Sequence, residues 1–194
     1  ITSCVTDRQK NVWVAVQNEG LYVLSSSGSI IKTYRQDDST LQTKNILYML
    51  CDSKGRVHVC TEKGFFIFTA LDKWINRYKA PKDFTRGGYY VLHCYEDKEK
   101  NIWYSKHIGI EVLDENLQHK FSISSADNNA PIKRTIITGC TQDDKGNIWI
   151  ATLSNGLYQY KNGSLVQYST SNGLSSNVIY GVVSDDKGRL WATS

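Results

Sequence analysis

A motif that returns about every 45 residues constrains this chain more than any other feature of its sequence. Trp13, Trp103, Trp149 and Trp191 end the matching contexts KNVW, KNIW, GNIW and GRLW, and His58 ends a fifth context, GRVH. The steps between successive members are 45, 45, 46 and 42 residues. A period of this length is typical of a propeller blade or of an array of paired helices.

The residue types within each period decide between these two architectures. The segments are rich in Val, Ile, Tyr and Trp and alternate between apolar and polar residues. Alternation with a period of two indicates β-strands, whereas an amphipathic helix needs apolar residues at a spacing near 3.6. The pattern therefore excludes a helical array and predicts an all-β fold.

Each period divides into four expected strands. The first strand ends at an aspartate that opens a turn, in Asp7, Asp52, Asp97, Asp143 and Asp185. Such an Asp can accept hydrogen bonds from backbone N–H groups two or three residues further on. The second strand carries the Trp or His. The third follows a glycine, in Gly20, Gly64, Gly109 and Gly156, and the fourth closes on an aromatic residue, in Tyr34, Tyr78, Phe121 and Tyr168.

Four antiparallel strands in each period predict a β-propeller, whose sheets pack both faces against their neighbours. We expect four complete four-stranded blades, at approximately residues 1–39, 40–86, 87–131 and 132–172, and a partial fifth at 173–194. Four and a half blades do not close a ring, and natural proteins cover open blade faces. The chain is therefore expected to be an incomplete propeller that needs further blades from its parent protein.

The recurring Trp is interpreted as a packing residue between blades rather than as a platform for a sugar, because it returns at one register in every blade. Each such aromatic side chain buries on the order of 150–250 Å². The blade in which His58 replaces Trp is expected to pack less well. Asn162-Gly163, between the third and fourth strands of the last complete repeat, predicts a type I′ turn.

The repeat also resembles a known family. An aspartate turn, a Trp strand, a Gly-Leu-Tyr element, a closing aromatic and the segment NGLSSNVI at residues 172–179 recur in order. This order resembles the two-component regulator propeller repeat, and the resemblance covers nearly the whole chain. It implies the periplasmic sensor region of a Bacteroidetes-type hybrid two-component system, in which seven-bladed propellers precede a membrane helix, a histidine kinase and a response regulator.

The resemblance implies a ligand and partners as well. It implies an oligosaccharide ligand, control of glycan-utilisation genes through the downstream kinase, a homodimeric receptor and an anchor in the inner membrane. The kinase and its phosphoacceptor lie outside these 194 residues. No stretch of this chain is long and apolar enough to span a membrane. The chain begins at Ile1 without a signal peptide, which fits a piece of a longer protein.

Charge and cysteine content exclude several other classes. The net charge of +4 is spread along the chain, and its densest basic stretch, residues 79–86, includes an Asp, so nucleic-acid binding is not expected. No cysteine or histidine spacing indicates a metal, and no cofactor is expected.

Counting back from the turn places Cys51 opposite Arg56 and Cys60 opposite Leu47. We therefore expect no intrachain disulfide, although a periplasmic setting would permit one.

The enzyme interpretation remains an alternative. Sialidase-type propellers share an Asp turn followed by Trp, but they need an arginine cluster, a Tyr/Glu nucleophile pair and an acid. The seven arginines of this chain show no such clustering, and no motif for nucleophilic or phosphate chemistry is present. We therefore expect no catalysis by this segment. The alternatives are a glycan-processing enzyme of sialidase or lyase type and a protein-interaction scaffold.

The ligand is expected at one end of the propeller. The loops that join the second strand to the third, and one blade to the next, gather there. Polar and aromatic residues in these loops are the candidate ligand-binding residues: Asn18, Glu19, Lys63, Arg86, Tyr89, Lys106, His107, Arg134 and Asn155.

Overall fold

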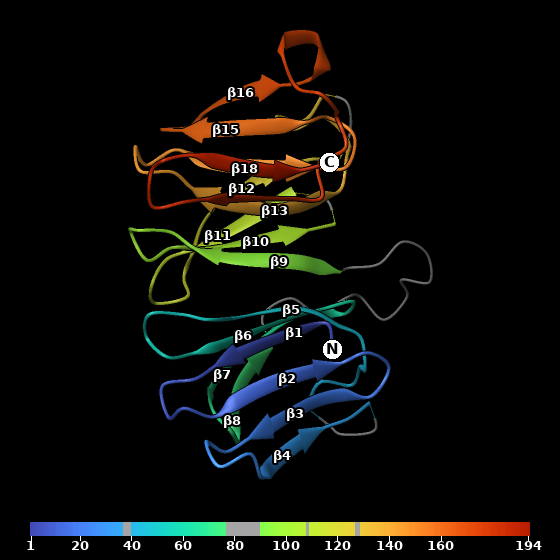
Figure 1. The fold of residues 1–194 in the computed structure, drawn as a ribbon, viewed down its shortest axis with the longest axis vertical. Helices are drawn as coiled ribbons and strands as arrows, with labels where there is room; N and C mark the ends of the chain where they lie inside the picture. The colour runs from blue at the N-terminus through green and yellow to red at the C-terminus, as the bar shows by residue number, and fades with distance from the viewer. Residues whose placement is uncertain (37–39, 77–89, 108, 127–128) are drawn as a thin grey trace. The chain divides into compact units, whose positions relative to one another are not determined.

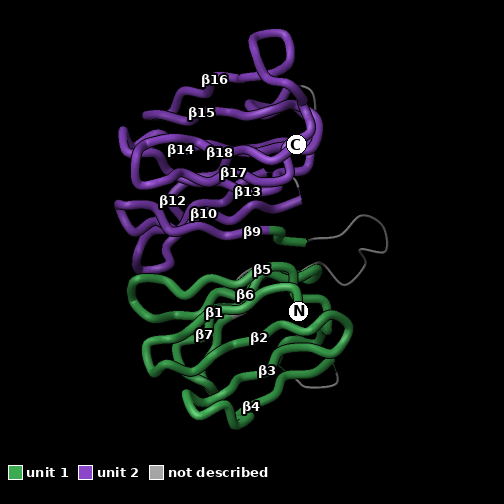
Figure 2. Tube along the Cα trace, in the orientation of Figure 1, with its two compact units in different colours: residues 1–92 green, residues 93–194 purple. Residues whose placement is uncertain are grey.

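The computed structural model describes residues 1–36, 40–76, 90–107, 109–126 and 129–194. The chain divides into two compact units, which we call unit 1 (residues 1–92) and unit 2 (residues 93–194) (Figure 2). In the described residues both units consist of antiparallel strands, shown as arrows in Figure 1, and the one helical element is a single 3₁₀ turn, η1 (Thr170–Asn172).

Unit 1 contains two four-stranded sheets, each with its strands in chain order. The first consists of β1 (Ser3–Thr6), β2 (Val12–Val16), β3 (Gly20–Leu24) and β4 (Ile30–Tyr34). The second consists of β5 (Ile46–Cys51), β6 (Val57–Thr61), β7 (Gly64–Ala70) and β8 (Lys73–Asn76). The first strands of the two sheets are neighbours, since Thr2 donates to the Ile46 carbonyl at 2.9 Å and the Met49 N–H donates to Ser3 at 3.0 Å.

Unit 2 repeats this arrangement and adds a two-stranded sheet. Its first sheet consists of β9 (Val91–Glu96), whose first two residues belong to unit 1, and of β10 (Ile102–Lys106), β11 (Gly109–Leu113) and β12 (His119–Ser124). Its second consists of β13 (Ile137–Gln142), β14 (Ile148–Thr152), β15 (Leu157–Lys161) and β16 (Ser164–Tyr168). The short sheet consists of β17 (Gly181–Ser184) and β18 (Leu190–Thr193), and Thr138 donates to the Ile179 carbonyl just before it at 2.8 Å.

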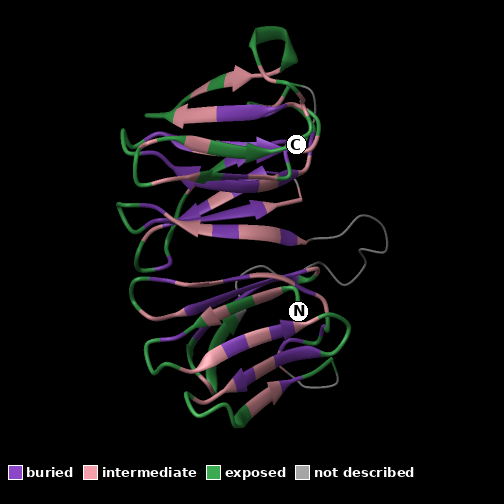
Figure 3. Ribbon diagram, viewed as in Figure 1, coloured by how far each residue is buried: buried purple, intermediate pink, exposed green. Residues whose placement is uncertain are grey.

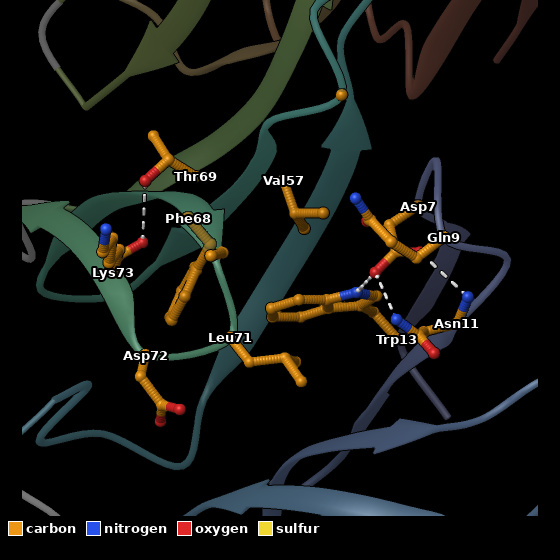
Figure 4. A pocket seen from close by; sticks show the side chains of 12 residues that line it. Asp7, Gln9, Asn11, Trp13, Val57, Phe68, Thr69, Leu71, Asp72 and Lys73 are labelled. Carbon is orange, nitrogen blue, oxygen red and sulfur yellow. Dashed lines mark hydrogen bonds between the residues drawn. The ribbon is translucent and has the colours of Figure 1, made fainter.

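A single carboxylate organises the turn between the first and second strands. In the first sheet Asp7 accepts the backbone N–H of Asn11 at 2.9 Å, the side-chain amide of Asn11 at 3.0 Å and the indole N–H of Trp13 at 2.9 Å (Figure 4). The backbone donors to these carboxylates lie two and four residues on, as for Lys145 and Asn147 with Asp143. The donor three residues on is also present, but it bonds to the main-chain carbonyl of the Asp, as Gly146 does to Asp143 at 3.3 Å. The expected donors two and three residues on are therefore confirmed, and the donor four residues on is additional.

His58 keeps this arrangement where the Trp is replaced. Its Nε2 atom lies 2.8 Å from Oδ2 of Asp52, the position that the indole nitrogen takes in the other repeats. His58 has no exposed surface, and every residue of β6 is buried. The expected loss of packing is therefore not visible in this strand, because the imidazole replaces the hydrogen bond as well as part of the ring.

Aromatic side chains fill the space between consecutive sheets within each unit. In unit 1 Trp13 packs against Tyr34 of its own sheet and Phe68 of the next, with ring centroids 6.1 and 5.2 Å away. In unit 2 Trp103 packs in the same way against Phe121 and Tyr160, each at 5.5 Å. The second and third strands are correspondingly the most buried in the first three sheets, whereas in the fourth sheet the first and second strands, β13 and β14, are the most buried (Figure 3).

The register of the cysteine-bearing hairpin differs from the expected one. Cys51 lies opposite Val57 and Cys60 opposite Tyr48. The expected partners were each one residue away, because Asp52 and Arg56 themselves close the turn and set one register from Tyr48 to Cys51.

Candidate ligand-binding site

The loops predicted to hold the ligand form a pocket in unit 2. It has a volume of about 290 Å³ and lies between the β10–β11 loop, the β12–β13 connection and the β14–β15 loop. Apolar side chains of Ile136 and Leu153 line one part of it. The polar lining consists of His107, Ser125, Arg134, Thr135 and Ser154.

Hydrogen bonds from neighbouring loops hold the segment that carries Arg134. The side-chain amide of Asn155 donates to the Lys133 carbonyl at 3.1 Å, and Ser125 donates to the Thr135 carbonyl at 3.4 Å. Asn155 is itself held, since Gln167 donates to its carbonyl at 2.9 Å. The backbone around Arg134 is therefore fixed from both sides, which lowers the ordering cost of binding a ligand there.

The hydroxyl groups of this pocket are arranged as acceptors. Ser154 donates to Thr135 Oγ1 at 2.8 Å, and Ser125 already donates to a carbonyl. A hydroxyl whose proton is engaged can still accept hydrogen bonds through its oxygen. Arg134 supplies donors and a fixed positive charge, and among the described residues that line the pocket there is no carboxylate. The pocket therefore combines acceptors for hydroxyl groups with one strong cationic donor.

Unit 1 has a pocket of about 500 Å³ between the corresponding loops, and its chemistry is different. Gln17, Asn18, Asn45, Glu62 and Tyr90 supply most of its polar lining. The carboxylate of Glu62 accepts the Asn45 amide at 2.7 Å and the Thr43 hydroxyl at 2.9 Å. This pocket presents amides, an aromatic ring and an acid, and none of its lining residues in the described part of the chain is cationic.

A third pocket, of about 460 Å³, lies at the turns of unit 1 and is shown in Figure 4. Two carboxylates line it: Asp7 already accepts bonds from Asn11 and Trp13, and Asp72 accepts one from Lys32 at 2.7 Å. The aromatic rings beside it are closed off, since Trp13 and Phe68 expose only 2% and 1% of their surface. Because its polar groups and rings are engaged in packing, we interpret this hollow as part of the folding motif.

The nine residues predicted from the sequence to bind the ligand lie in different places in the structure. His107 and Arg134 line the unit 2 pocket, and Asn18 lines the unit 1 pocket. Asn155 donates to the Lys133 carbonyl, next to Arg134. Three others line none of these pockets and have partners of their own: Glu19 with Tyr22, Lys63 with the Gln42 carbonyl, and Lys106 with Glu111. Arg86 and Tyr89 lie outside the described residues.

Sequence reasoning missed Ser125 and Thr135 in unit 2 and Asn45 and Tyr90 in unit 1. All four flank the ends of strands in connections between sheets. Ser125 directly follows β12, so its position at the end of a fourth strand was a usable signal.

Buried titratable groups elsewhere in unit 2 are shifted toward their neutral forms. Burial lowers the pKa of His93 to about 4 and raises the pKa of Cys140 to about 12. An imidazole with this pKa is a weak base at neutral pH, and a thiol with this pKa forms almost no thiolate. Within the described part of the chain, no group of three or more His, Cys, Asp or Glu residues could hold a metal.

Comparison with solved structures places this geometry in a known fold. The chain matches the extracellular domain of the hybrid two-component system BT3049 from B. thetaiotaomicron with a TM-score of 0.81 and 23% identity, over 99% of this chain and 25% of that one. The extracellular domain of BT4673 from the same organism matches with a TM-score of 0.80 and 18% identity, over 98% and 26%. Virginiamycin B lyase from Staphylococcus aureus matches with a TM-score of 0.75 and 12% identity, over 98% and 62%.

The fold is a β-propeller. The predicted all-β fold, with four four-stranded blades and a two-stranded partial blade, is thereby confirmed.

The chain spans about a quarter of the length of the two extracellular domains that it matches. No protein-family model and no curated protein sequence matches it. Among the described residues, no helix is long and apolar enough to cross a lipid bilayer.

Proposed function

We propose that this chain is a ligand-sensing segment of a bacterial two-component receptor and that it binds an oligosaccharide in the periplasm. The observation that carries the proposal is the unit 2 pocket, where His107 and Arg134 come together from separate loops beside acceptor hydroxyls. Such an arrangement of donors and acceptors suits sugar hydroxyls. The likeness in fold to extracellular domains of two-component systems supports a sensing role.

The proposed mechanism is a shift between arrangements of a larger assembly. Buried aromatic side chains pack consecutive sheets together, so we expect a ligand to signal by favouring one arrangement of the receptor rather than by repacking these sheets. We propose a homodimeric receptor anchored in the inner membrane, in which this shift reaches paired histidine kinases and controls genes for glycan use. On this mechanism other blades contribute to the site.

Calorimetry against a panel of glycan oligosaccharides tests the proposal. The full periplasmic region should bind at least one oligosaccharide, and this chain alone should bind it more weakly. His107→Ala should weaken binding, whereas Lys106→Ala, which changes a neighbour paired with Glu111, should not. If no oligosaccharide binds to the periplasmic region, the sensing proposal fails.

The enzyme alternative rests on the likeness to virginiamycin B lyase. Mass spectrometry of each oligosaccharide after prolonged incubation with the protein distinguishes the two functions. A sensor returns the oligosaccharide unchanged, whereas cleavage products that accumulate with time would replace the sensor proposal with an enzymatic one.

A further inference from the structure

In unit 2, Arg134 differs from Lys106 and Arg189, two cations that also lie at or beside the ends of strands. Lys106 pairs with Glu111 at 2.7 Å, and Arg189 pairs with Asp185 at the same distance. Within the described part of the chain, the Arg134 guanidinium has no carboxylate partner, although it lines a pocket whose backbone is held by Asn155 and Ser125. Arg134 is exposed, and only the backbone beside it is held. Its guanidinium is therefore accessible to a negative charge from outside.

We propose that the unit 2 pocket binds an anionic sugar residue, one that carries a carboxylate or a sulfate, through Arg134. This inference rests on the proposed sensing of oligosaccharides and names the class of ligand. A guanidinium offers two parallel N–H groups that match two oxygens of a carboxylate or sulfate, a geometry that a lysine cannot reproduce. The hydroxyl oxygens of Ser125 and Ser154 would accept hydrogen bonds from the ring hydroxyls of the same sugar.

The size of the pocket limits how much of the ligand enters it. Its volume of about 290 Å³ lies at the lower end for ligand pockets, which begin near 300 Å³. It therefore suits one charged residue of an oligosaccharide, with the remaining residues outside. The unit 1 pocket is lined by Glu62 and amides, so an anion would be repelled there and a neutral sugar accepted.

Paired ligands that differ only in charge test the inference. A uronate-containing oligosaccharide is compared with its neutral methyl ester, and a sulfated oligosaccharide with its desulfated form, by calorimetry with the full periplasmic region. The charged member of at least one pair should bind more tightly, and added salt should weaken its binding. Which pair shows the difference identifies the anion as a carboxylate or a sulfate.

Variants locate the charge that is recognised. Arg134→Gln should weaken binding of the charged ligand by about tenfold to a hundredfold and leave the neutral form unaffected. Arg134→Lys should recover part of this loss, since it keeps the charge without the paired donors. Lys133→Gln is the matched control, because it removes the same charge from an adjacent exposed residue that does not line the pocket.

The outcomes separate this inference from the sensing proposal. If charged and neutral forms bind equally and Arg134→Gln has no effect, the anion inference is wrong while oligosaccharide sensing stands. Equal losses in Arg134→Gln and Lys133→Gln would also overturn it, since they would indicate general attraction to the surface. If no oligosaccharide of either kind binds, the sensing proposal itself fails.

Discussion

At the scale of single residues, one carboxylate joins three parts of every repeat. Its Oδ1 atom accepts the backbone N–H four residues on, and its Oδ2 atom accepts a ring N–H six residues on, as Asp97 does with Asn101 and Trp103. Asn or Arg at the fourth position gives a further bond to Oδ2, as Arg189 does to Asp185. The repeat therefore conserves a set of hydrogen bonds while its residue types vary.

The first prediction concerns the stability that the Asp52 carboxylate contributes to the fold and that is lost in acid. Burial tends to raise the pKa of this carboxyl, but hydrogen bonds from His58 and Arg56 outweigh burial and hold the pKa at about 2, below the ordinary 3.8. Because the folded-state pKa is depressed, its contribution is present above pH 3.8 and is lost as the pH falls through about 2. Asp52→Asn should therefore lower the free energy of unfolding at neutral pH by about 1–3 kcal/mol.

Denaturant titrations of the wild type and the variant at neutral pH and near pH 2 measure this effect. The difference between them should shrink at the lower pH. Asp72→Asn, at an exposed carboxylate, is the control and should change stability little at either pH. A deficit for Asp52→Asn that is the same at both values would show that the carboxylate charge is not its source.

At the scale of elements, a glycine opens the third strand where the fourth strand passes close by. A Cβ atom at Gly156 would lie 2.1 Å from the carbonyl oxygen of Tyr168, at the end of β16. Gly163, in the turn between β15 and β16, has a similar positive φ (84° against 75°) but no atom within 4 Å of such a Cβ. The two glycines share a backbone requirement and differ in the space around them.

Gly156→Ala should therefore destabilise the protein more than Gly163→Ala. Both carry the strain of alanine at positive φ, about 1–2 kcal/mol. Only Gly156→Ala also forces the two strands apart, which should add about 1–3 kcal/mol. Thermal and denaturant unfolding of both variants measures the difference, and equal losses would rule out the close approach of β16 as the reason for this glycine.

Burial of the motif Trp depends on the sheet that follows it. Trp103 is 3% exposed between Phe121 and Tyr160, whereas Trp191, in the two-stranded sheet, is 55% exposed. Both indoles donate to the Asp six residues earlier, at 2.8 and 2.9 Å. The hydrogen bond therefore forms within one hairpin, while burial needs the neighbouring sheet.

Trp103→Phe should accordingly lower the free energy of unfolding much more than Trp191→Phe. Each variant loses the same indole N–H, but only the first loses buried volume and leaves the Asp with fewer partners inside the protein. We expect about 2–4 kcal/mol for Trp103→Phe and less than about 1 kcal/mol for Trp191→Phe. Chemical unfolding of the two proteins provides the comparison, and similar losses would show that packing between sheets contributes little.

At the scale of the whole molecule, the five cysteine thiols differ in their exposure to solvent. Cys4 is exposed, whereas Cys60, Cys94 and Cys140 are buried, and Cys51 is intermediate. Cys4, Cys94 and Cys140 occupy matching positions on first strands, three residues before the turn Asp. Similar sequence positions therefore differ in accessibility, because accessibility depends on what packs over each strand.

We predict that the protein has no intrachain disulfide and that Cys4 is the first thiol to react. Alkylation of the folded protein should label Cys4 and leave Cys140 unlabelled, even at pH 9, because burial raises its pKa to about 12. Unfolding should expose all five thiols. Mass spectrometry with peptide mapping reads out both results, and the loss of two hydrogens per cysteine pair would contradict the prediction.

The sequence by itself determined the strand content, the four four-stranded blades and the register of the packing Trp residues. It could do so because alternation, turn residues and the period of about 45 are local properties of the chain. The type I′ turn at Asn162-Gly163 follows for the same reason, and both residues have positive φ, 49° and 84°.

Only the tertiary structure decided which loop residues share a pocket. His107 and Arg134 lie 27 positions apart and meet because consecutive sheets bring their loops together, while Lys106, next to His107, turns to Glu111. Asn155, a predicted ligand contact, also holds the backbone beside Arg134. Side-chain direction and neighbours in a loop depend on the packing of separate sheets, and no local pattern in the chain records that packing.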